Sequence, residues 1–166
     1  MRDEHTTQAM THPHWKRHTA FFVGSQTLSL LGTSLVQYAV LWYITLETKS
    51  GIMMMIATAV GMVPTLLMGP FAGVWADRYD RKKLIAYADM GIATVTFVTA
   101  LLYWQGHGSL LLLFVMMALR AFGTAIQTPA VGAFLPQIVP QEKLMRVNGI
   151  MGSIQPIIMI ISPILS

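Results

Sequence analysis

The chain has 166 residues, of which 54% are hydrophobic and only 11% are charged, and its formal net charge is +4. Soluble domains carry about a quarter charged residues, so this composition excludes an ordinary soluble protein and favours an integral membrane protein. The chain contains no cysteine, which excludes a disulfide framework, thiol catalysis and a cysteine metal site.

Residues 1–19 form a polar stretch of mixed charge, which we expect to be a cytoplasmic tail. Two of its histidines lie in the sequence His12-Pro13-His14. A metal site is one interpretation, but no ligand spacing defines a geometry, and a solvated terminus accounts for the same residues. We therefore expect no metal and no cofactor. The following apolar run lacks a small-residue cleavage site and is too long for a signal-peptide core, so it is expected to be a retained membrane helix.

Residues 20–166 contain five apolar stretches, each about as long as the roughly 20 residues that an α-helix needs to cross the hydrocarbon core. A soluble core helix of this length would show a polar face. The predicted spans are residues 20–46, 51–76, 84–104, 110–128 and 148–166. The pattern predicts an all-α fold, a multi-pass transmembrane helical bundle.

The predicted connections between the spans differ in length. Residues 47–49 and 105–109 are short links, as expected between antiparallel neighbours in a bundle. Residues 129–147 are expected to form a longer connection, because they contain three prolines. Pro140 followed by Glu142 is typical of a helix start, with proline at the first position and an acid in the first turn.

Lysine and arginine are distributed unevenly over the two sides of this layout. The residues on one side are Arg2, Lys16, Arg17, Arg78, Arg81, Lys82, Lys83, Lys143 and Arg146. Only Lys49 lies on the other side, and Arg120 lies within a span. Cytoplasmic loops carry the excess of basic residues, so the N-terminus and residues 77–83 are predicted to face the cytoplasm from the inner or plasma membrane. The basic excess therefore reflects topology, and no nucleic-acid partner is expected.

Residues 77–83 hold six charged side chains in seven positions, between two apolar spans. This segment is too short for a domain and too charged for hydrocarbon, so we expect a polar turn between two membrane helices. Asp77 lies at the C-terminal end of the second predicted helix, where the helix dipole disfavours a carboxylate. An arginine or the N-terminus of another helix would offset this cost, which makes Asp77 a candidate gate latch.

Arg120 lies near the middle of the fourth span, where a charge costs about 2.5–3.5 kcal/mol on insertion scales. Such residues face a bundle interior or a wet cavity. Gly123 follows one turn later and Gln127 two turns later, so the same face offers a position for close approach and a second polar group. We interpret Arg120 as functional; the alternative is a structural donor to neighbouring backbone.

Asp89 lies in the second turn of the third predicted span, near the cytoplasmic interface. Two interpretations remain open: the carboxylate pairs with Lys82 or Lys83 or reaches headgroup water, or it is a titratable or gating group. The spans contain no His/Glu metal pattern, no Ser/His pairing and no carboxylate pair, so an enzyme is not expected.

Polar residues recur at helical spacing in the first and fifth spans. These stripes are Gln26, Ser29, Thr33 and Gln37 in the first span, and Asn148, Gly152, Gln155 and Ser162 in the fifth. Hydrogen bonds between helices, worth about 0.6 kcal/mol each, are one explanation. Two stripes together with Arg120 favour a substrate cavity instead. Its candidate lining residues are Gln26, Thr33, Gln37, Gln127 and Gln155.

The charged turn resembles the motif that the major facilitator superfamily carries between its second and third helices, Gly-x-x-x-Asp-Arg-x-Gly-Arg-Arg/Lys. The matching residues are Gly73, Asp77, Arg78, Arg81 and Lys82, while Asp80 replaces the usual glycine. Residues 120–125 resemble the Arg-x-x-x-Gly motif of the fourth helix. The fifth span resembles the drug-antiporter motif only weakly, because Gly149 and Pro163 fit but other glycines of the motif are absent.

A longer resemblance, to the macrolide-efflux branch of the superfamily, covers residues 15–166. Its pieces are Trp15-Lys16-Arg17, residues 77–83 with Asp80, Ala88-Asp89, Thr128-Pro129-Ala130, Val139-Pro140 and Ser162-Pro163. The branch also carries aspartate at the position of Asp80. The resemblance implies a twelve-helix transporter in two halves that works by alternating access driven by proton entry, with this chain supplying helices one to five of the N-terminal half.

The resemblance also implies roles for individual residues. The turn residues Gly73, Asp77, Arg78, Arg81 and Lys82 would form a gating motif. Arg120, Asp89 and Gly123 would form the membrane-embedded region of proton coupling, in which Arg120 tunes a nearby proton-binding carboxylate. The implied partners are the lipid bilayer, protons, a small hydrophobic substrate and the C-terminal half of the same transporter.

We therefore expect the N-terminal portion of a proton-coupled secondary active exporter of hydrophobic drugs, with macrolides as the suggested cargo. Two alternatives remain open: an exporter of another cargo, such as a siderophore or a metabolite, or an inactive truncated membrane protein. Hydrophobic residues continue to the last position, and so we expect a fragment or a truncated product that does not transport by itself.

Overall fold

The structure, a computed structural model, describes residues 15–166, and these form five helices. They are α1 (Trp15–Thr48), α2 (Gly51–Arg78), α3 (Arg81–Trp104), α4 (Leu110–Ile138) and α5 (Gln141–Leu165). All five are long and apolar enough to cross a membrane. The predicted all-α, multi-pass bundle is therefore confirmed. Most of the predicted tail at 1–19 lies outside the described residues.

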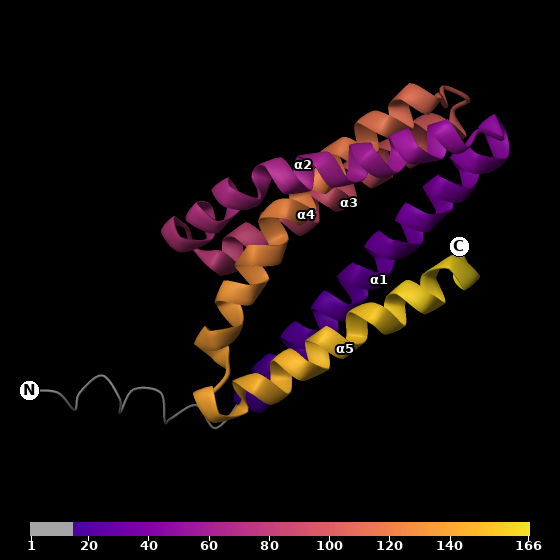
Figure 1. Cartoon of the computed structure of the whole chain (residues 1–166). Helices are drawn as coiled ribbons and strands as arrows, with labels where there is room; N and C mark the ends of the chain where they lie inside the picture. Colours follow the sequence, from indigo (N-terminus) through magenta and orange to yellow (C-terminus); the bar gives the residue numbers. More distant parts are fainter. Residues whose placement is uncertain (1–14) are drawn as a thin grey trace, which may run out of the picture.

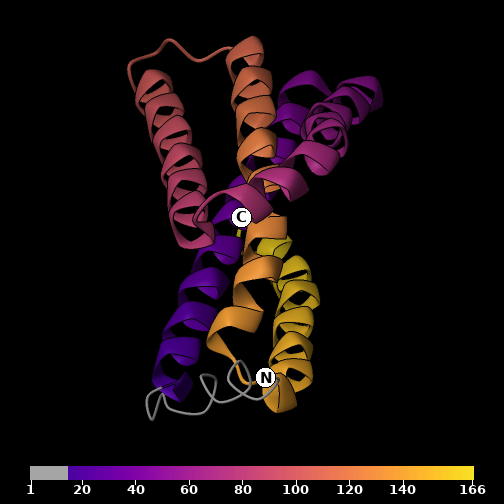
Figure 2. The same ribbon diagram turned by 90° about the vertical axis from the view of Figure 1, so that its left-hand side faces the viewer.

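Consecutive helices run in alternating directions (Figure 1). The α1–α2 and α3–α4 connections lie at one end of the bundle, and the α2–α3 and α4–α5 connections lie at the other. α4 packs along both α2 and α3, whereas α1 packs mainly along α5 and α2 and crosses α4. Figure 2 shows the first part of α4 beside α3 and its last part near α1 and α5. α4 therefore connects the helices that it packs along, α2 and α3, with the pair formed by α1 and α5.

The predicted connection at 129–147 is wrong, because α4 continues through two prolines to Ile138 and α5 begins at Gln141. A proline holds φ near the helical value and removes one backbone hydrogen bond, so it bends a helix without ending it where packing supports both sides. The predicted helix start is close to the observed one. Pro140 immediately precedes α5, and Glu142 lies in its first turn.

α1 and α3 both begin before their predicted spans, because a helix can extend beyond the hydrocarbon core into the aqueous region. Asp80 explains the start of α3. Its side chain accepts hydrogen bonds from the backbone N–H groups of Lys82 (3.0 Å) and Lys83 (3.4 Å). The aspartate that replaces the glycine of the motif is therefore the N-cap of α3, a position at which aspartate is favoured.

Buried apolar side chains gather toward the two ends of the bundle. The cluster nearer the α3–α4 connection contains Val40, Ile44, Ala57, Leu113, Met116 and Met117. The clusters nearer the opposite end contain Ala76, Ile85 and Ala130, and Leu135, Val139 and Val147. Between them, α4 carries two buried polar residues, Arg120 and Gln127. The apolar ends thus enclose a polar middle section.

Candidate functional site

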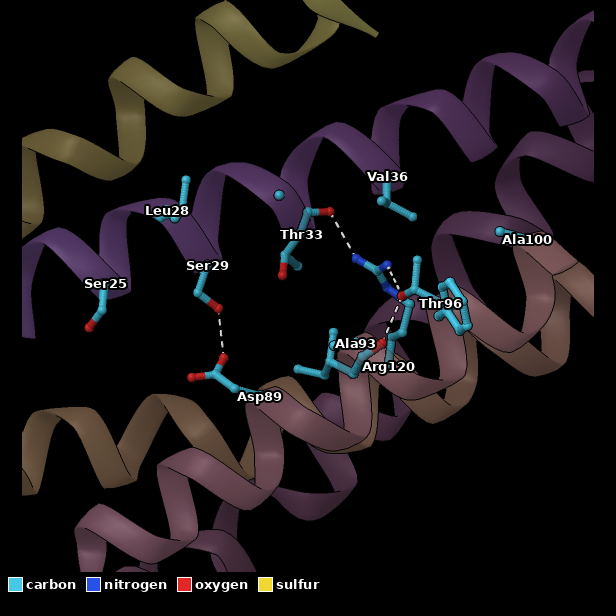
Figure 3. Close-up of a pocket in the computed structure, with 13 residues that line it drawn as sticks. Ser25, Leu28, Ser29, Thr33, Val36, Asp89, Ala93, Thr96, Ala100 and Arg120 are labelled. Atoms are coloured by element: carbon cyan, nitrogen blue, oxygen red, sulfur yellow. Dashed lines mark hydrogen bonds between the residues drawn. The ribbon is translucent and has the colours of Figure 1, made fainter.

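Arg120 lies in this middle section with 4% of its surface exposed. Its guanidinium donates from Nη1 to the Thr96 hydroxyl of α3 at 2.6 Å. It also donates from Nη2 to the backbone carbonyl of Thr33 in α1 at 3.0 Å (Figure 3). Among residues 15–166, no carboxylate forms an ion pair with it. Arg120 therefore connects α4 to α3 and α1 through neutral acceptors, one of them a backbone carbonyl, which is the contact that its structural interpretation expects.

Asp89 is the centre of a second polar contact between the same three helices. Its Oδ1 accepts a hydrogen bond from the Ser29 hydroxyl of α1 at 2.6 Å and from Nε2 of Gln127 in α4 at 2.7 Å. Nε2 of Gln127 also donates to Oε1 of Gln26 at 3.4 Å. Gln26 and Gln127 are both buried. Hydrogen bonds to a charged acceptor are about twice as strong as neutral ones, so this node holds α3 against α1 and α4.

One of the contacts left open for Asp89, an ion pair with Lys82 or Lys83, is not formed. Both lysines are exposed, and within residues 15–166 no lysine or arginine forms an ion pair with Asp89. The Asp89 side chain points from α3 toward Ser29 of α1 (Figure 3). The Asp89 carboxylate therefore binds residues of α1 and α4 and not a lysine of its own helix.

The two contacts form two polar layers, and on each of the three helices one residue of the first layer lies seven positions from one residue of the second, with Ser29 of α1 as an additional member of the Asp89 layer. The pairs are Gln26 and Thr33 on α1, Asp89 and Thr96 on α3, and Gln127 and Arg120 on α4. Seven residues are two helical turns, so the layers lie about 10 Å apart along the helices. The order is reversed on α4 because this helix runs antiparallel to the other two. This repeated spacing is the signal in the sequence that could have identified the layers.

The first cavity, which we call the α1–α3 cleft, has a volume of about 630 Å³ and lies between these two helices. It is lined by Ser25, Leu28, Ser29, Gly32, Thr33, Val36, Asp89, Ile92, Ala93, Thr96, Phe97, Ala100 and Arg120 (Figure 3). The cleft therefore contains one negative and one positive side chain in largely apolar walls.

The second cavity, which we call the central pocket, has a volume of about 280 Å³ and lies between α1, α2, α4 and α5. It is lined by Thr33, Ser34, Gln37, Tyr38, Leu41, Gly61, Thr65, Met117, Arg120, Ala121, Thr124 and Met159. Its walls combine soft apolar side chains with hydroxyl and amide groups. Thr33 and Arg120 line both cavities, so their hydrogen bond forms part of the wall between them.

The five predicted substrate-lining residues separate into three groups. Thr33 and Gln37 line the central pocket. Gln26 and Gln127 are buried in the hydrogen-bond node of Asp89 and line neither of the two cavities. Gln155 is exposed on α5 and also lines neither. Helical periodicity identified the polar face of α1, but it could not tell a cavity wall from a buried hydrogen bond.

Gly123 has a packing role in this structure. A Cβ atom at this position would lie 2.6 Å from Cγ1 of Ile92 in α3, far closer than a van der Waals contact. The missing side chain therefore allows α3 and α4 to approach closely, as small residues do between membrane helices. Gly123 follows Arg120 by three positions, one fewer than in the Arg-x-x-x-Gly motif.

The gating-motif residues surround the α2–α3 turn. Arg81 donates from Nε to the Ala76 carbonyl at the end of α2 (3.0 Å) and from Nη1 to the Ala133 carbonyl of α4 (3.0 Å). It also pairs with Asp77 at 3.6 Å, although the Asp77 side chain remains 76% exposed. Arg81 thus fastens the end of α2 to α4. Arg78 and Lys82 are exposed, and Gly73 would accept a Cβ atom without a contact.

Comparison with known proteins identifies a family of membrane transporters. The model of the Major Facilitator Superfamily matches residues 22–166 of this chain. Macrolide efflux protein A of Streptococcus pyogenes is 33% identical over 149 residues, which are 90% of this chain and 37% of the relative. Macrolide efflux protein A of Enterococcus faecalis is 34% identical over 111 residues, or 67% of this chain and 34% of the relative.

The Staphyloferrin A transporter of Staphylococcus aureus is more distant, at 26% identity over 121 residues, which are 72% of this chain and 30% of the relative. The matched part of the chain spans between 30% and 37% of the length of these curated relatives. No solved structure matches it.

Proposed function

Because this chain belongs to the major facilitator superfamily, a family of membrane transporters, we propose that it forms part of a secondary active exporter of hydrophobic drugs, including macrolides. The observation that carries the proposal is the 33% identity with Macrolide efflux protein A over 149 residues. The membership also argues against an enzyme. Because the chain covers 37% of that relative, the complete transport pathway in this proposal includes a second half supplied by further sequence.

In this proposal the substrate binds against the central pocket. Transporters of this superfamily place their substrate near the bilayer midplane, between two halves that rock about it. The central pocket is lined by four helices and lies beside the middle section of α4. Its volume of about 280 Å³ is at the lower limit for a drug-sized ligand, so the facing half would supply the rest of the site. Tyr38, Met117 and Met159 would contact the apolar parts of the cargo.

Asp89 is the proposed proton carrier. Protonation would remove its charge and weaken the hydrogen bonds from Ser29 and Gln127, which hold α3 to α1 and α4. α1 and α4 are also the helices that Arg120 joins at the carbonyl of Thr33, in the wall of the central pocket. A change at Asp89 could therefore reach the substrate side through two helices without any direct contact between proton and cargo.

The α2–α3 turn is the proposed cytoplasmic gate. Basic residues of this turn and of the first turns of α5 lie at one end of the bundle, and Lys49 lies at the other (Figure 1). This asymmetry supports a cytoplasmic N-terminus. Asp77 is exposed despite its contact with Arg81, so its carboxylate is available to a helix of the second half as a latch.

A siderophore is the second candidate cargo. The similarity to the Staphyloferrin A transporter motivates it, and one feature of the pocket favours it. Arg120 is the one charged residue among those that line the central pocket, so this half of the site offers a cation and no carboxylate. Such a site accommodates an oxygen-rich or anionic cargo more readily than a cationic one.

The proposed function is tested by expressing the complete reading frame that contains this segment in a host without its own efflux pumps. We expect a higher minimal inhibitory concentration for macrolides, and lower macrolide accumulation, than in the empty-vector control. Collapse of the proton gradient should restore accumulation. Unchanged sensitivity to macrolides, with the protein present in the membrane, would contradict the proposal. Accumulation of a labelled carboxylate siderophore in the same cells tests the second candidate.

A further inference from the structure

A third cavity lies between α3 and α4, outside the site described above, and we call it the outer groove. Its volume is about 270 Å³. Its walls are made of aliphatic side chains and glycine, and the Tyr87 hydroxyl is the single polar side-chain group among its lining residues. Tyr87 is 69% exposed and Leu119 is 49% exposed. The groove therefore opens toward the outside of the five-helix bundle.

Glycine gives the groove its depth. A Cβ atom added at Gly91 would meet no atom within 4 Å, so the absent side chain leaves open space. Gly123 on the facing helix is different, because a Cβ atom there would collide with Ile92. The two glycines thus bring α3 and α4 close together at one point and leave a channel beside it.

A stripe of four residues on α3 defines the direction of the groove. Lys83, Tyr87, Gly91 and Val95 follow one another at a spacing of four, which places them on one face of the helix. The stripe covers twelve residue steps, or about 18 Å. One leaflet of a bilayer contributes about half of the roughly 30 Å hydrocarbon core. The α3 residues that line the groove run from Leu84 to Val95, which are eleven residue steps or about 16.5 Å apart, so the groove is about as long as the acyl chain of one leaflet.

Lys83 supplies a charge at the aqueous end of this stripe. Its side chain is exposed, and within the described part of the chain it forms no ion pair. The backbone amides of Lys82 and Lys83 are occupied by the Asp80 carboxylate, so an anion at this end would be held by the lysine ammonium and not by the helix terminus. Tyr87 lies one turn deeper, at the level where aromatic rings with a polar end prefer the membrane interface.

We propose that the outer groove binds one membrane phospholipid, with an acyl chain between α3 and α4 and an anionic headgroup phosphate on Lys83. Binding of an acyl chain in an apolar groove contributes little affinity for one particular lipid, since all lipid tails are about as apolar as leucine. Selectivity between headgroups therefore comes from the attraction of the Lys83 ammonium to a headgroup of net negative charge, and the channel at Gly91 provides the space for the acyl chain. The inference concerns the lipid-facing side of the bundle and does not depend on the cargo or on proton coupling.

The test uses the purified 166-residue chain in detergent micelles, with its melting temperature measured as phosphatidylglycerol or phosphatidylcholine of identical acyl chains is added. One lysine near an anionic headgroup should give phosphatidylglycerol an apparent affinity about fivefold higher. Lys83→Gln should abolish this preference, because the neutral side chain no longer distinguishes a headgroup of net charge −1 from a zwitterionic one. Gly91→Leu, which fills the channel, should reduce the binding of both lipids. The water-soluble headgroup glycerophosphoglycerol should not stabilise the chain.

Two variants serve as matched controls. Lys143→Gln removes an exposed lysine from the start of α5, and Gly149→Leu fills an equally open glycine position on α5. Both should retain the preference for phosphatidylglycerol. Equal binding of the two lipids by the unaltered chain, or a preference that persists in Lys83→Gln, would overturn the proposal. So would a loss of binding in Gly149→Leu as large as that in Gly91→Leu, with helical content verified by circular dichroism.

Discussion

The charged turn at 77–83 and the polar layers inside the bundle use charge in opposite ways. The turn contains six charged side chains, but most are exposed, and the one ion pair among the described residues spans 3.6 Å with an Asp77 side chain that is 76% exposed. The interior contains two charged residues, Arg120 and Asp89, and neither has a charged partner among the described residues. Together these two receive or donate four hydrogen bonds that join α1, α3 and α4.

The contrast shows that the burial of a charged residue, and not the number of charges around it, decides how much its contacts contribute to stability. Exposed ion pairs contribute about 0–1 kcal/mol, because water competes and the side chains lose freedom. Hydrogen bonds to charged groups away from water contribute about 1.5–3 kcal/mol each. The sparse interior charges should therefore control coupling between helices, while the dense turn should matter mainly through Arg81 and through contacts outside this chain.

The largest effect is expected for Arg120→Ala in the complete reading frame. This change removes both hydrogen bonds of the guanidinium and opens the wall between the α1–α3 cleft and the central pocket. We expect drug efflux to fall by about tenfold or more, the factor that corresponds to one charged hydrogen bond. Efflux and membrane expression are measured together. Arg146→Ala, which removes an exposed arginine of α5, is the control, and wild-type efflux by Arg120→Ala would exclude this residue from the mechanism.

A smaller but more specific effect is expected for Asp89→Asn. The amide oxygen can still accept from Ser29 and Gln127, but it is a neutral and therefore weaker acceptor, so the chain should still fold and its melting temperature should fall. Asparagine cannot carry a proton in place of the carboxylate, so efflux should lose its dependence on the proton gradient while substrate binding persists. Asp80→Asn is the matched control, since asparagine is an equally good N-cap and lies outside the bundle. A dependence on the proton gradient that survives in Asp89→Asn would remove this carboxylate from proton coupling.

The smallest effects are expected in the turn, where Asp77→Asn and Arg81→Met should differ. Asp77→Asn removes an exposed pair and should lower the free energy of unfolding of the chain by less than about 1 kcal/mol. Arg81→Met also removes the donors to the Ala76 and Ala133 carbonyls and should cost about 1.5–3 kcal/mol. Thermal unfolding in micelles measures both. Equal losses would mean that the ion pair, and not the contact with backbone, holds the turn.

The gating proposal for Asp77 needs a separate measurement in the complete protein. A latch should be visible as greater access of thiol reagents to cysteines placed on the cytoplasmic side of Asp77→Asn. Unchanged access would count against the latch even if the stability of the chain follows the expectation above.

Much of the architecture follows from local rules that a sequence obeys directly. Long apolar runs specify membrane helices, because a backbone in hydrocarbon must satisfy its own hydrogen bonds. The turn at 77–83, the start of α5 after Pro140 and the burial of Arg120 could all be predicted in this way. The continuation of α4 beyond residue 128 could not, since proline ends a helix only when packing does not support the helix on both sides.

Composition and periodicity thus established a polytopic helical protein with a charged turn and a buried arginine in its fourth helix. Only the tertiary structure decided which polar groups meet. From the sequence, Asp89 had two open interpretations: contact with Lys82, Lys83 or headgroup water, or a titratable or gating role. The sequence also suggested that Gln26, Gln127 and Gln155 line one cavity. The antiparallel register of α4 against α1 and α3 brings residues up to 101 positions apart into one hydrogen-bond node and leaves Gln155 outside it. A helix face is a local property, but its partner is set by the packing of the whole bundle.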